Sequence, residues 1–469
     1  MSTISSPAGR GRARTPKAVA QRKTAPRRGP TTARKATTQR STQHKPATQG
    51  TGRRKGAART RRVRWRDSAA WQSPVTSYYL IGGVSLLLLA LGLIMVLSSS
   101  SIYSLASSDG ASAFADFFSQ AAYALIAVPL AFGLSRLPVR AYRSLAWVAM
   151  VVTLAMQALV FTPLARADGG NANWVHLAPG VTVQPSEFAK LGLALWLGVV
   201  LAAKGRLLEQ WRHIFVPALV VSALFVGTVL YSHDLGTALI YVALIAGALW
   251  VAGVPASKFL VGACVAVALV GYLAFSSENR THRIMHFLGL AGGDSPAGTG
   301  YQTLHAMRGL GSGGLSGVGL GASKEKWLWL PAGDNDFIFA VIGEELGFLG
   351  SLFVLVLFLM LAVGMCRLIM RHPDPFVKIA TAGIACWILG QAVINIGVAI
   401  GVLPVIGLPL PLVSKGGSSL VATIGALGVV LAFARDEPGA KEALAARRGS
   451  MRRSLAVISP RRSTRGRRA

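Results

Sequence analysis

Charged and amide side chains between about residues 276 and 336 interrupt a sequence that is otherwise strongly apolar. Among them are Arg283, Asp294, Gln302 and Asp336, with glycines and prolines typical of turns nearby. A carboxylate in such a segment can act as a general base, and a cation can stabilise negative charge. The pattern therefore indicates a chemical site, with a solvated loop carboxylate as the alternative for Asp294.

A second polar set lies inside apolar segments. Glu187 and Lys190 are three residues apart, so a helix places them on one face as an ion pair. Asp234 opens a turn in a neighbouring segment and can join them in an outward-facing cavity. Charges at mid-membrane normally face a partner or a wet cavity because burying them alone is costly. A structural salt bridge that fixes helix packing is the alternative.

The composition places these side chains in a membrane protein. Hydrophobic residues make up 52% and charged residues only 14% of the 469 residues, which excludes an ordinary soluble enzyme. We expect an all-α polytopic membrane protein with about ten transmembrane helices and a large extracytoplasmic loop between helices 7 and 8. The spans are predicted at about Tyr78–Leu97, Phe117–Leu134, Leu145–Phe161, Pro185–Ala203, Ile214–Leu230, Leu235–Val254, Phe259–Phe275, Phe337–Met365, Val377–Val402 and Ser418–Phe433.

Two basic tails account for most of the net charge of +31. Residues 1–66 hold 20 Lys and Arg with no Asp or Glu, and residues 435–469 hold 11 with three acidic residues. The near-neutral remainder argues against a nucleic-acid partner. We expect the tails to bind anionic membrane lipids, with a solvated tail as the alternative. The predicted domains are a disordered cytoplasmic tail at 1–70, a membrane domain at 71–435 with its extracytoplasmic loop at about 276–336, and a second cytoplasmic tail at 436–469.

Basic residues in short loops also predict the orientation, because Lys and Arg are retained on the cytoplasmic side. Arg136, Arg140 and Arg143 follow the second predicted span, and Arg367 and Arg371 follow the eighth. Both tails are then cytoplasmic, and the polar segment at 276–336 faces outward. The three cysteines fall in apolar runs, and neither metal-ligand spacing nor a P-loop or HExxH motif is present, so we predict no metal site.

Several short motifs follow one another along the membrane domain in an order typical of one family. They are Gln184-Pro185-Ser186-Glu187 with Lys190, Asp234-Leu235-Gly236-Thr237, Gly300-Tyr301-Gln302, Asp336-Phe337-Ile338-Phe339, Gly343-Glu344-Glu345-Leu346-Gly347, and Ser414 with Gly416-Gly417-Ser418-Ser419. From about Tyr78 to Arg435 the chain resembles the FtsW/RodA (SEDS) family, and its details are more similar to the division enzymes than to the elongation enzymes. The resemblance implies a ten-helix glycosyltransferase that polymerises lipid II into peptidoglycan outside the cytoplasmic membrane, at the division septum.

The resemblance also implies roles for individual residues. Asp294 is the expected catalytic general base, which takes the proton of the acceptor hydroxyl as polyprenyl diphosphate leaves. The residues expected to bind substrate are Arg283, Gln302, Lys324, Lys326, Ser414, Lys415, Gly416, Gly417 and Ser418. The residues expected to form a polar cavity or support are Glu187, Lys190, Asp234, Asp336, Glu344, Glu345 and Asn395. No bound cofactor is predicted, although a divalent cation, Mg²⁺ or Mn²⁺, can assist the leaving diphosphate.

Some positions depart from the family pattern. Lys415 stands where the family commonly has Tyr, His305 where Gln is common, and Asn173 precedes Trp174 where Arg is frequent. The partners implied are a class B penicillin-binding protein and other division proteins. Two further functions stay open: a lipid II flippase would also use the intramembrane charges, and a division scaffold would need only the tails and helix surfaces.

Overall fold

Long apolar helices make up most of the computed structural model, which describes residues 69–107, 113–168, 171–178, 181–276, 278–288, 290, 299–327 and 329–446. Nine described helices are long and apolar enough to cross a membrane, and a shorter apolar helix covers Leu235–Val251. At about 1.5 Å per residue this shorter helix spans about 26 Å, so it needs flanking residues to cross about 30 Å of hydrocarbon. The predicted all-α polytopic fold is confirmed.

The ten apolar segments occupy the ten predicted positions. They are α2 (Thr76–Ser107), α3 (Ala115–Arg136), α4 (Val139–Ala158), α5 (Pro185–Lys204), the run of α6 (Trp211–Ile214), η4 (Phe215–Leu219) and α7 (Val220–Tyr231), α8 (Leu235–Val251), α9 (Ala256–Phe275), α12 (Ile338–Arg371), α13 (Pro375–Ala399) and α14 (Gly417–Arg435). Short helices complete the helical set: α1 (Ala69–Gln72), η2 (Leu159–Phe161), η3 (Gly205–Glu209), α10 (Glu278–Phe287) and α11 (Thr299–Ser312).

Local sequence explains where several of these helices begin. Pro185 occupies the first turn of α5, where its missing N–H costs no hydrogen bond. Asp234 caps α8 by accepting the backbone N–H of Thr237 at 2.8 Å. Asp374 caps α13 in the same way through the N–H of Phe376 at 3.0 Å. These caps fix both helices at their first turn.

The helices α5, α13 and α14 form the most buried part of the bundle. Helix α14 packs along α3, α13 packs between α5 and α8, and α12 packs against α2. A side chain at Gly428 would place its Cβ 2.7 Å from backbone atoms of Ala131, so glycine permits the close crossing of α14 and α3. Helix α9 instead contacts mainly α8 and α10, and its exposed Leu260, Val267 and Tyr272 suit contact with lipid.

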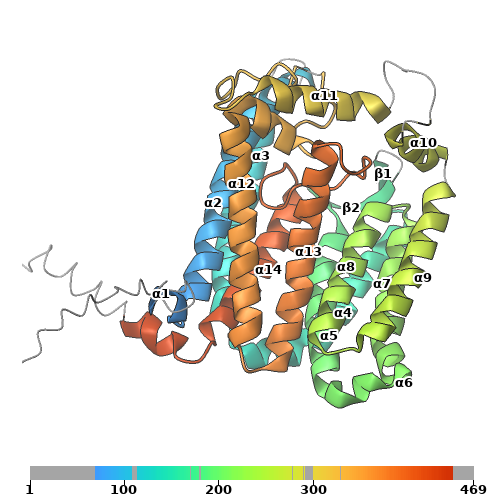
Figure 1. Cartoon of the computed structure of the whole chain (residues 1–469), viewed down its shortest axis with the longest axis vertical. Coiled ribbons are helices and arrows are strands. Elements are labelled where there is room, and N and C mark those ends of the chain that lie inside the picture. The colour runs from blue at the N-terminus through green and yellow to red at the C-terminus, as the bar shows by residue number, and fades with distance from the viewer. Residues whose placement is uncertain are drawn as a thin grey trace, which may run out of the picture. The chain divides into compact units, whose positions relative to one another are not determined.

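The basic loops gather at one end of the bundle, with α1 and α6, while α10, α11 and the strands lie at the other end (Figure 1). An ion pair of 2.5 Å between Arg143 and Asp374 joins the start of α4 to the start of α13 at the basic end. This clustering agrees with the predicted alternation of loops. The assignment of the basic end to the cytoplasm stays a prediction, and we call the opposite end the outer end.

Secondary structure at the outer end goes beyond the sequence-based prediction. The expected loop at 276–336 contains α10 and α11. Three short antiparallel strands, β1 (Ala165–Asp168), β2 (Asn171–Ala178) and β3 (Val181–Val183), form a sheet in the order β1-β2-β3, with Arg166 opposite Trp174 and Val175 opposite Val183. Strands of this length carry too little alternation to be distinguished from a polar loop.

A glycine contact joins the outer segment to α12. Gly347 interrupts this helix with a φ of 68°, and the freed backbone pairs with the segment after α11, since the N–H of Phe348 donates to Gly314 O at 2.9 Å. At Gly317, with a φ of 81°, an added Cβ would lie 2.1 Å from Glu345 O. Only glycine fits this approach, which fixes the outer segment on α12.

Candidate functional site

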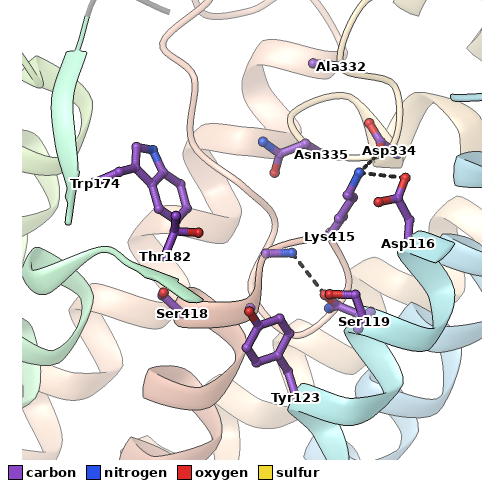
Figure 2. Close-up of a pocket in the computed structure, with 13 residues that line it drawn as sticks. Asp116, Ser119, Tyr123, Trp174, Thr182, Ala332, Asp334, Asn335, Lys415 and Ser418 are labelled. Carbon is purple, nitrogen blue, oxygen red and sulfur yellow. Dashed lines mark hydrogen bonds and ion pairs between the residues drawn. The ribbon is translucent and has the colours of Figure 1, made fainter. Parts of the chain in front are cut away.

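A polar pocket of about 380 Å³ lies at the outer end of the bundle (Figure 2). Side chains from α3, from the strands, from the segment before α12 and from the start of α14 converge on it. The lining residues are Asp116, Ser119, Gln120, Tyr123, Trp174, Thr182, Ala332, Asp334, Asn335, Lys415, Gly416, Gly417 and Ser418. Four of the predicted substrate-binding residues, 415–418, are therefore brought together in one cavity.

Gln120 on α3 holds the backbone that precedes α14. Its Nε2 donates to Ser414 O at 3.2 Å, and its Oε1 accepts the N–H of Gly416 at 3.1 Å. Tyr123, one turn further along α3, packs so close to Gly417 that an added Cβ there would lie 2.4 Å from the Tyr123 ring. The two side chains thus set the position of the first turn of α14 in the pocket wall.

Ser414 connects the same backbone to the segment before α12. Its hydroxyl donates to Asn335 O at 2.6 Å and accepts the N–H of Leu410 at 2.7 Å. The N–H of Lys415 donates to Asp334 O at 3.1 Å. Ser414 is buried by these contacts, so its place in the site is behind the pocket wall, where it orients Lys415.

The ammonium group of Lys415 lies between two carboxylates. Its Nζ is 2.8 Å from Asp116 Oδ2 and 3.1 Å from Asp334 Oδ2 (Figure 2). Burial alone lowers the pKa of Lys415, but Asp334 and Asp116 outweigh this effect and raise the pKa above its ordinary value. Lys415 is therefore a fixed positive charge at neutral pH, and it is the one cation among the described residues that line the pocket.

The N-terminus of α14 adds a second source of positive potential. The first bond within this helix runs from the N–H of Leu420 to Gly416 O. The N–H groups of Gly417, Ser418 and Ser419 precede that bond and have no partner within the helix. Such amides, with the helix dipole behind them, favour an anion. Gly417 and Ser418 can therefore present backbone donors to the same pocket as Lys415, whereas the N–H of Gly416 is taken by Gln120.

Asp336 follows the pocket residues Asp334 and Asn335 along the chain and is not itself part of the pocket lining. Burial, followed by the negative charge of Asp334, raises the pKa of Asp336 to about 6, against a smaller opposing effect of Arg283. The Oδ1 atom of Asp336 is buried without a hydrogen-bond partner. Asn395 fixes the backbone there by donating from Nδ2 to Asp336 O at 2.7 Å and to Leu408 O at 2.6 Å. Arg283 reaches this region from α10 and donates to Val405 O at 3.5 Å.

Asp234 connects α8 to the strand region. Besides capping α8, it accepts the side-chain Nδ2 of Asn173 at 2.6 Å through Oδ2. Both side chains are buried, so the pair fixes β2, with the pocket residue Trp174, against the bundle. Asn173 thus has a positioning contact at the place where the family frequently has Arg.

Glu187 and Lys190 form the ion pair that their spacing predicts. Lys190 Nζ is 2.8 Å from Glu187 Oε1, and both side chains are buried within the bundle. The ammonium also donates to Gln391 Oε1 at 3.4 Å and lies 4.8 Å from the Trp387 ring. These contacts link α5 to α13. The pair does not line the pocket, and Glu187 Oε2 has no hydrogen-bond partner.

Lys326, Glu344 and Glu345 form a separate network at the outer end. Lys326 Nζ lies 3.3 Å from Glu345 Oε1 and donates to Gly321 O at 2.6 Å, and only 5% of its side chain is exposed. Glu344 accepts the Ser323 hydroxyl at 2.5 Å and the N–H of Lys324 at 2.8 Å. This network holds the outer segment on α12, and it places Lys326 away from the pocket.

The remaining predicted residues have different positions. Gln302 lies on α11, outside the pocket lining, and the Lys324 side chain is exposed to solvent. His305 on α11 is fixed by Glu325, 2.5 Å from its Nδ1, and by the Tyr301 ring. Asp294 lies outside the described residues. The described part of the chain contains no group of three or more His, Cys, Asp or Glu side chains placed to hold a metal ion.

Comparison with known proteins assigns the family. The model of the family described as "Cell cycle protein" (FTSW_RODA_SPOVE) matches residues 78–438. The chain belongs to this family. It is 37% identical over 388 residues to a "Probable peptidoglycan glycosyltransferase FtsW" of Mycobacterium tuberculosis, covering 82% of this chain and 73% of that protein. It is 34% identical to "Stage V sporulation protein E" of Bacillus subtilis, covering 75% and 95% respectively.

Solved structures of the FtsW, RodA and SpoVE family share the fold. A chain from a study titled "Structural coordination of polymerization and crosslinking by a peptidoglycan synthase complex" has a TM-score of 0.62 and 29% identity, covering 76% of this chain and 97% of that chain. Thermus thermophilus RodA, a rod shape determining protein, has a TM-score of 0.55 and 27% identity, covering 77% and 97%. The predicted enzyme class, a peptidoglycan glycosyltransferase in a multi-pass membrane protein, is confirmed by these relatives.

Sequence reasoning missed the four pocket residues on α3, which are Asp116, Ser119, Gln120 and Tyr123. Asp116 and Gln120 lie one turn apart and meet Lys415 and Gly416, just before α14 and about 300 positions later. Polar residues four apart at the start of an otherwise apolar helix were the available signal, because they mark one helical face. Asp334, which no motif in the sequence marked as a site residue, pairs with Lys415.

Proposed function

We propose that this glycosyltransferase polymerises lipid II into glycan strands on the outer face of the cytoplasmic membrane during septal wall synthesis. The observation that carries the proposal is the polar pocket at the outer end, in which one ammonium group and the start of α14 face a cavity. A lipid-linked sugar has an anionic diphosphate between its sugar and its polyprenyl chain. The Lys415 ammonium group and the amides at the start of α14 suit that head group.

The reaction needs three functions from the protein. The acceptor hydroxyl attacks the anomeric carbon of the donor sugar, the bond from that carbon to the diphosphate oxygen breaks, and its electron pair leaves with polyprenyl diphosphate. Asp294 accepts the hydroxyl proton as general base. Lys415 and the amides of α14 stabilise the leaving diphosphate. Arg283, which belongs to α10, stabilises negative charge near the acceptor sugar. A divalent cation at the diphosphate stays a prediction, and the roles above are assigned to side chains and backbone amides alone.

Partners and orientation belong to the same proposal. The structural relative that comes from a peptidoglycan synthase complex for polymerization and crosslinking supports a crosslinking partner, for which we propose a class B penicillin-binding protein. Both tails are assigned to the cytoplasm, where their basic residues bind anionic lipids. Other division proteins complete the assembly at the septum.

Strand synthesis by the purified chain with its partner transpeptidase tests the proposal. Wild type is expected to polymerise lipid II, and Asp294→Asn is expected to lose about 10²- to 10⁴-fold in rate, because the amide cannot accept the proton. Glu209→Gln removes an exposed carboxylate at the basic end and serves as the matched control. Full activity of Asp294→Asn would show that Asp294 is not the general base. If wild type made no product beside an active partner, the proposed polymerase function would be overturned.

A lipid II flippase is the second candidate, and the buried Glu187–Lys190 pair is the observation that favours it. Intramembrane charges are characteristic of transport pathways. A translocation assay in vesicles separates the two functions: a flippase moves labelled lipid II without elongating it and tolerates Asp294→Asn. Loss of translocation in Glu187→Gln with polymerisation retained would favour the flippase.

A further inference from the structure

The charged side chains of the pocket do not by themselves favour an anionic ligand. Asp116 and Asp334 contribute two carboxylates, and Lys415 contributes one ammonium group, so these side chains carry a net negative charge. A pocket built only to hold a diphosphate would not be expected to include two carboxylates beside its single cation. The carboxylates therefore need an explanation beyond anion binding.

The two carboxylates belong to different elements of the fold, and each residue has a hydrogen bond besides its ion pair with Lys415. Asp116 begins α3 and accepts the Ser104 hydroxyl at 2.8 Å, while Asp334 precedes α12 and is tied through its backbone oxygen to the N–H of Lys415. Both Oδ2 atoms converge on the same Nζ at 2.8 and 3.1 Å. The ammonium is thus held between two fixed acceptors, while its own stem has rotatable bonds that allow it to turn toward a third.

Exposure shows that the ammonium can exchange partners. The Lys415 side chain is 36% exposed and that of Asp116 is 24% exposed, although Asp334 is only 9% exposed. Lys326 and Glu345, which form the other lysine pair of the outer end, are 5% and 0% exposed. Ion pairs that water reaches are weak and reform readily, since solvent screens each charge. A diphosphate entering the pocket can therefore take Lys415 from its carboxylates, and the carboxylates can take it back.

We propose that Asp116 and Asp334 are product-release residues, which compete with polyprenyl diphosphate for the ammonium group of Lys415. This inference rests on the proposed function. While the bond between the anomeric carbon and the diphosphate oxygen breaks, Lys415 and the amides of Gly417 and Ser418 receive the negative charge. After transfer, the carboxylates recapture Lys415 and repel the diphosphate, so the product leaves. The residues act through Lys415 and take no proton in this cycle.

Substituting the carboxylate and substituting the ammonium group of this ion pair should change the affinity for a diphosphate in opposite directions. Asp116→Asn removes a competitor and a negative charge, so the affinity for a lipid diphosphate is expected to rise three- to tenfold. Lys415→Gln removes the cation, so the affinity is expected to fall tenfold or more. A residue with only a structural role would not increase affinity when it is substituted.

The experiment measures equilibrium binding to the full-length purified chain in detergent, with farnesyl diphosphate as probe and inorganic pyrophosphate as a second arm. Wild type, Asp116→Asn, Asp334→Asn and Lys415→Gln are compared after thermal unfolding shows that each is folded. Arg308→Gln removes an exposed cation of α11 outside the pocket and controls for general charge. If the aspartate variants bind both pyrophosphate and farnesyl diphosphate more tightly than wild type does, the carboxylates compete with the diphosphate group alone. If they bind only farnesyl diphosphate more tightly, the prenyl chain also contributes to the gain in affinity.

Unchanged or weaker binding in both aspartate variants, or unchanged binding in Lys415→Gln, would overturn the inference. Because the measurement needs no turnover, it is independent of the polymerisation assay. If the aspartate variants bind the diphosphate more tightly than the wild type but the wild type makes no glycan, the proposed function is contradicted while the competition of the carboxylates is supported. Active strand synthesis by wild type, with no change of diphosphate binding in the aspartate variants, would support the proposed function and contradict the competition of the carboxylates.

Discussion

Two charged clusters at the outer end use the same residue types for different purposes. In the pocket, Lys415 pairs with Asp116 and Asp334 while 36% of its side chain stays exposed. In the network on α12, Lys326 pairs with Glu345, whose side chain is fully buried. The buried pair also has backbone and hydroxyl partners, including the Ser98 hydroxyl at 2.6 Å from Glu345 Oε2. The exposed pair can respond to a ligand, and the buried pair fixes the segment around it.

The difference follows from desolvation. Charges removed from water are stable only with complete partners, so a buried pair resists rearrangement and losing one member is costly. A hydrated pair gains little from its contact and loses little when it opens. Burial, more than residue type, therefore separates the site from its support, and substitutions in the two clusters should differ accordingly.

The largest effect is expected for Glu345→Gln. This substitution leaves the Lys326 ammonium buried without its counter-ion, which costs about 3–5 kcal/mol of stability. A lower midpoint of thermal unfolding in detergent, with faster hydrogen exchange between Gly313 and Trp327, is the expected result. The double variant Lys326→Met with Glu345→Gln removes the buried charge and should recover most of the loss. No recovery would show that the pair's charge is not what fixes the segment.

Gly317→Ala should detach the same segment by a steric route. Its Cβ would lie 2.1 Å from Glu345 O at a φ of 81°, so both the clash and the left-handed backbone oppose alanine. We expect a loss of about 3 kcal/mol, followed by thermal unfolding. Gly314→Ala is the matched control, because its φ of 57° is also left-handed but its Cβ would meet open space. Its expected loss is about 1 kcal/mol, and equal losses would exclude the close contact as the cause.

A stabilising substitution is expected beside the pocket, at Asp336. Its pKa is about 6 in the folded chain and near 4 in an unfolded one, so between these values the folded state binds more protons. Stability from this group is therefore full below pH 4 and falls as the pH rises to 6. Asp336→Asn should remove that fall and stabilise the chain at pH 7.5 by about 1–3 kcal/mol. Unfolding midpoints of both proteins between pH 4 and 8 test this, and parallel curves would contradict it.

Local patterns predicted much of this architecture. The ten apolar segments followed from length and composition, and the Glu187–Lys190 pair followed from a spacing of three residues on one helix. Ser414 to Ser418 were placed at the site by their resemblance to a family motif, and Lys415, Gly416, Gly417 and Ser418 do line the pocket. Such predictions depend on neighbours in the sequence or on a motif that carries its own context.

Contacts between distant segments could not be predicted in this way. Asp116 meets Lys415 only because α3 packs along α14, and Lys326 is buried only because Ser98 and Glu345 come from α2 and α12. Nothing near Lys326 in the sequence distinguishes it from the pocket lysine. The short strands and the helices of the outer segment were missed because their periodic pattern is too brief.

The smallest effect on stability is expected for Lys415→Gln, the substitution expected to weaken diphosphate binding most. Lys415→Gln opens a pair whose lysine is 36% and whose Asp116 is 24% exposed, and Asp116 keeps the Ser104 hydroxyl. The amide can still donate to the less exposed Asp334 carboxylate, so the loss should be about 1 kcal/mol. Thermal unfolding of this variant beside Glu345→Gln measures the contrast directly. Added salt should narrow the small difference between Lys415→Gln and wild type, because ions screen an exposed pair. A loss as large as that of Glu345→Gln would make Lys415 a second structural lysine, and a falling diphosphate affinity would then report misfolding of the pocket.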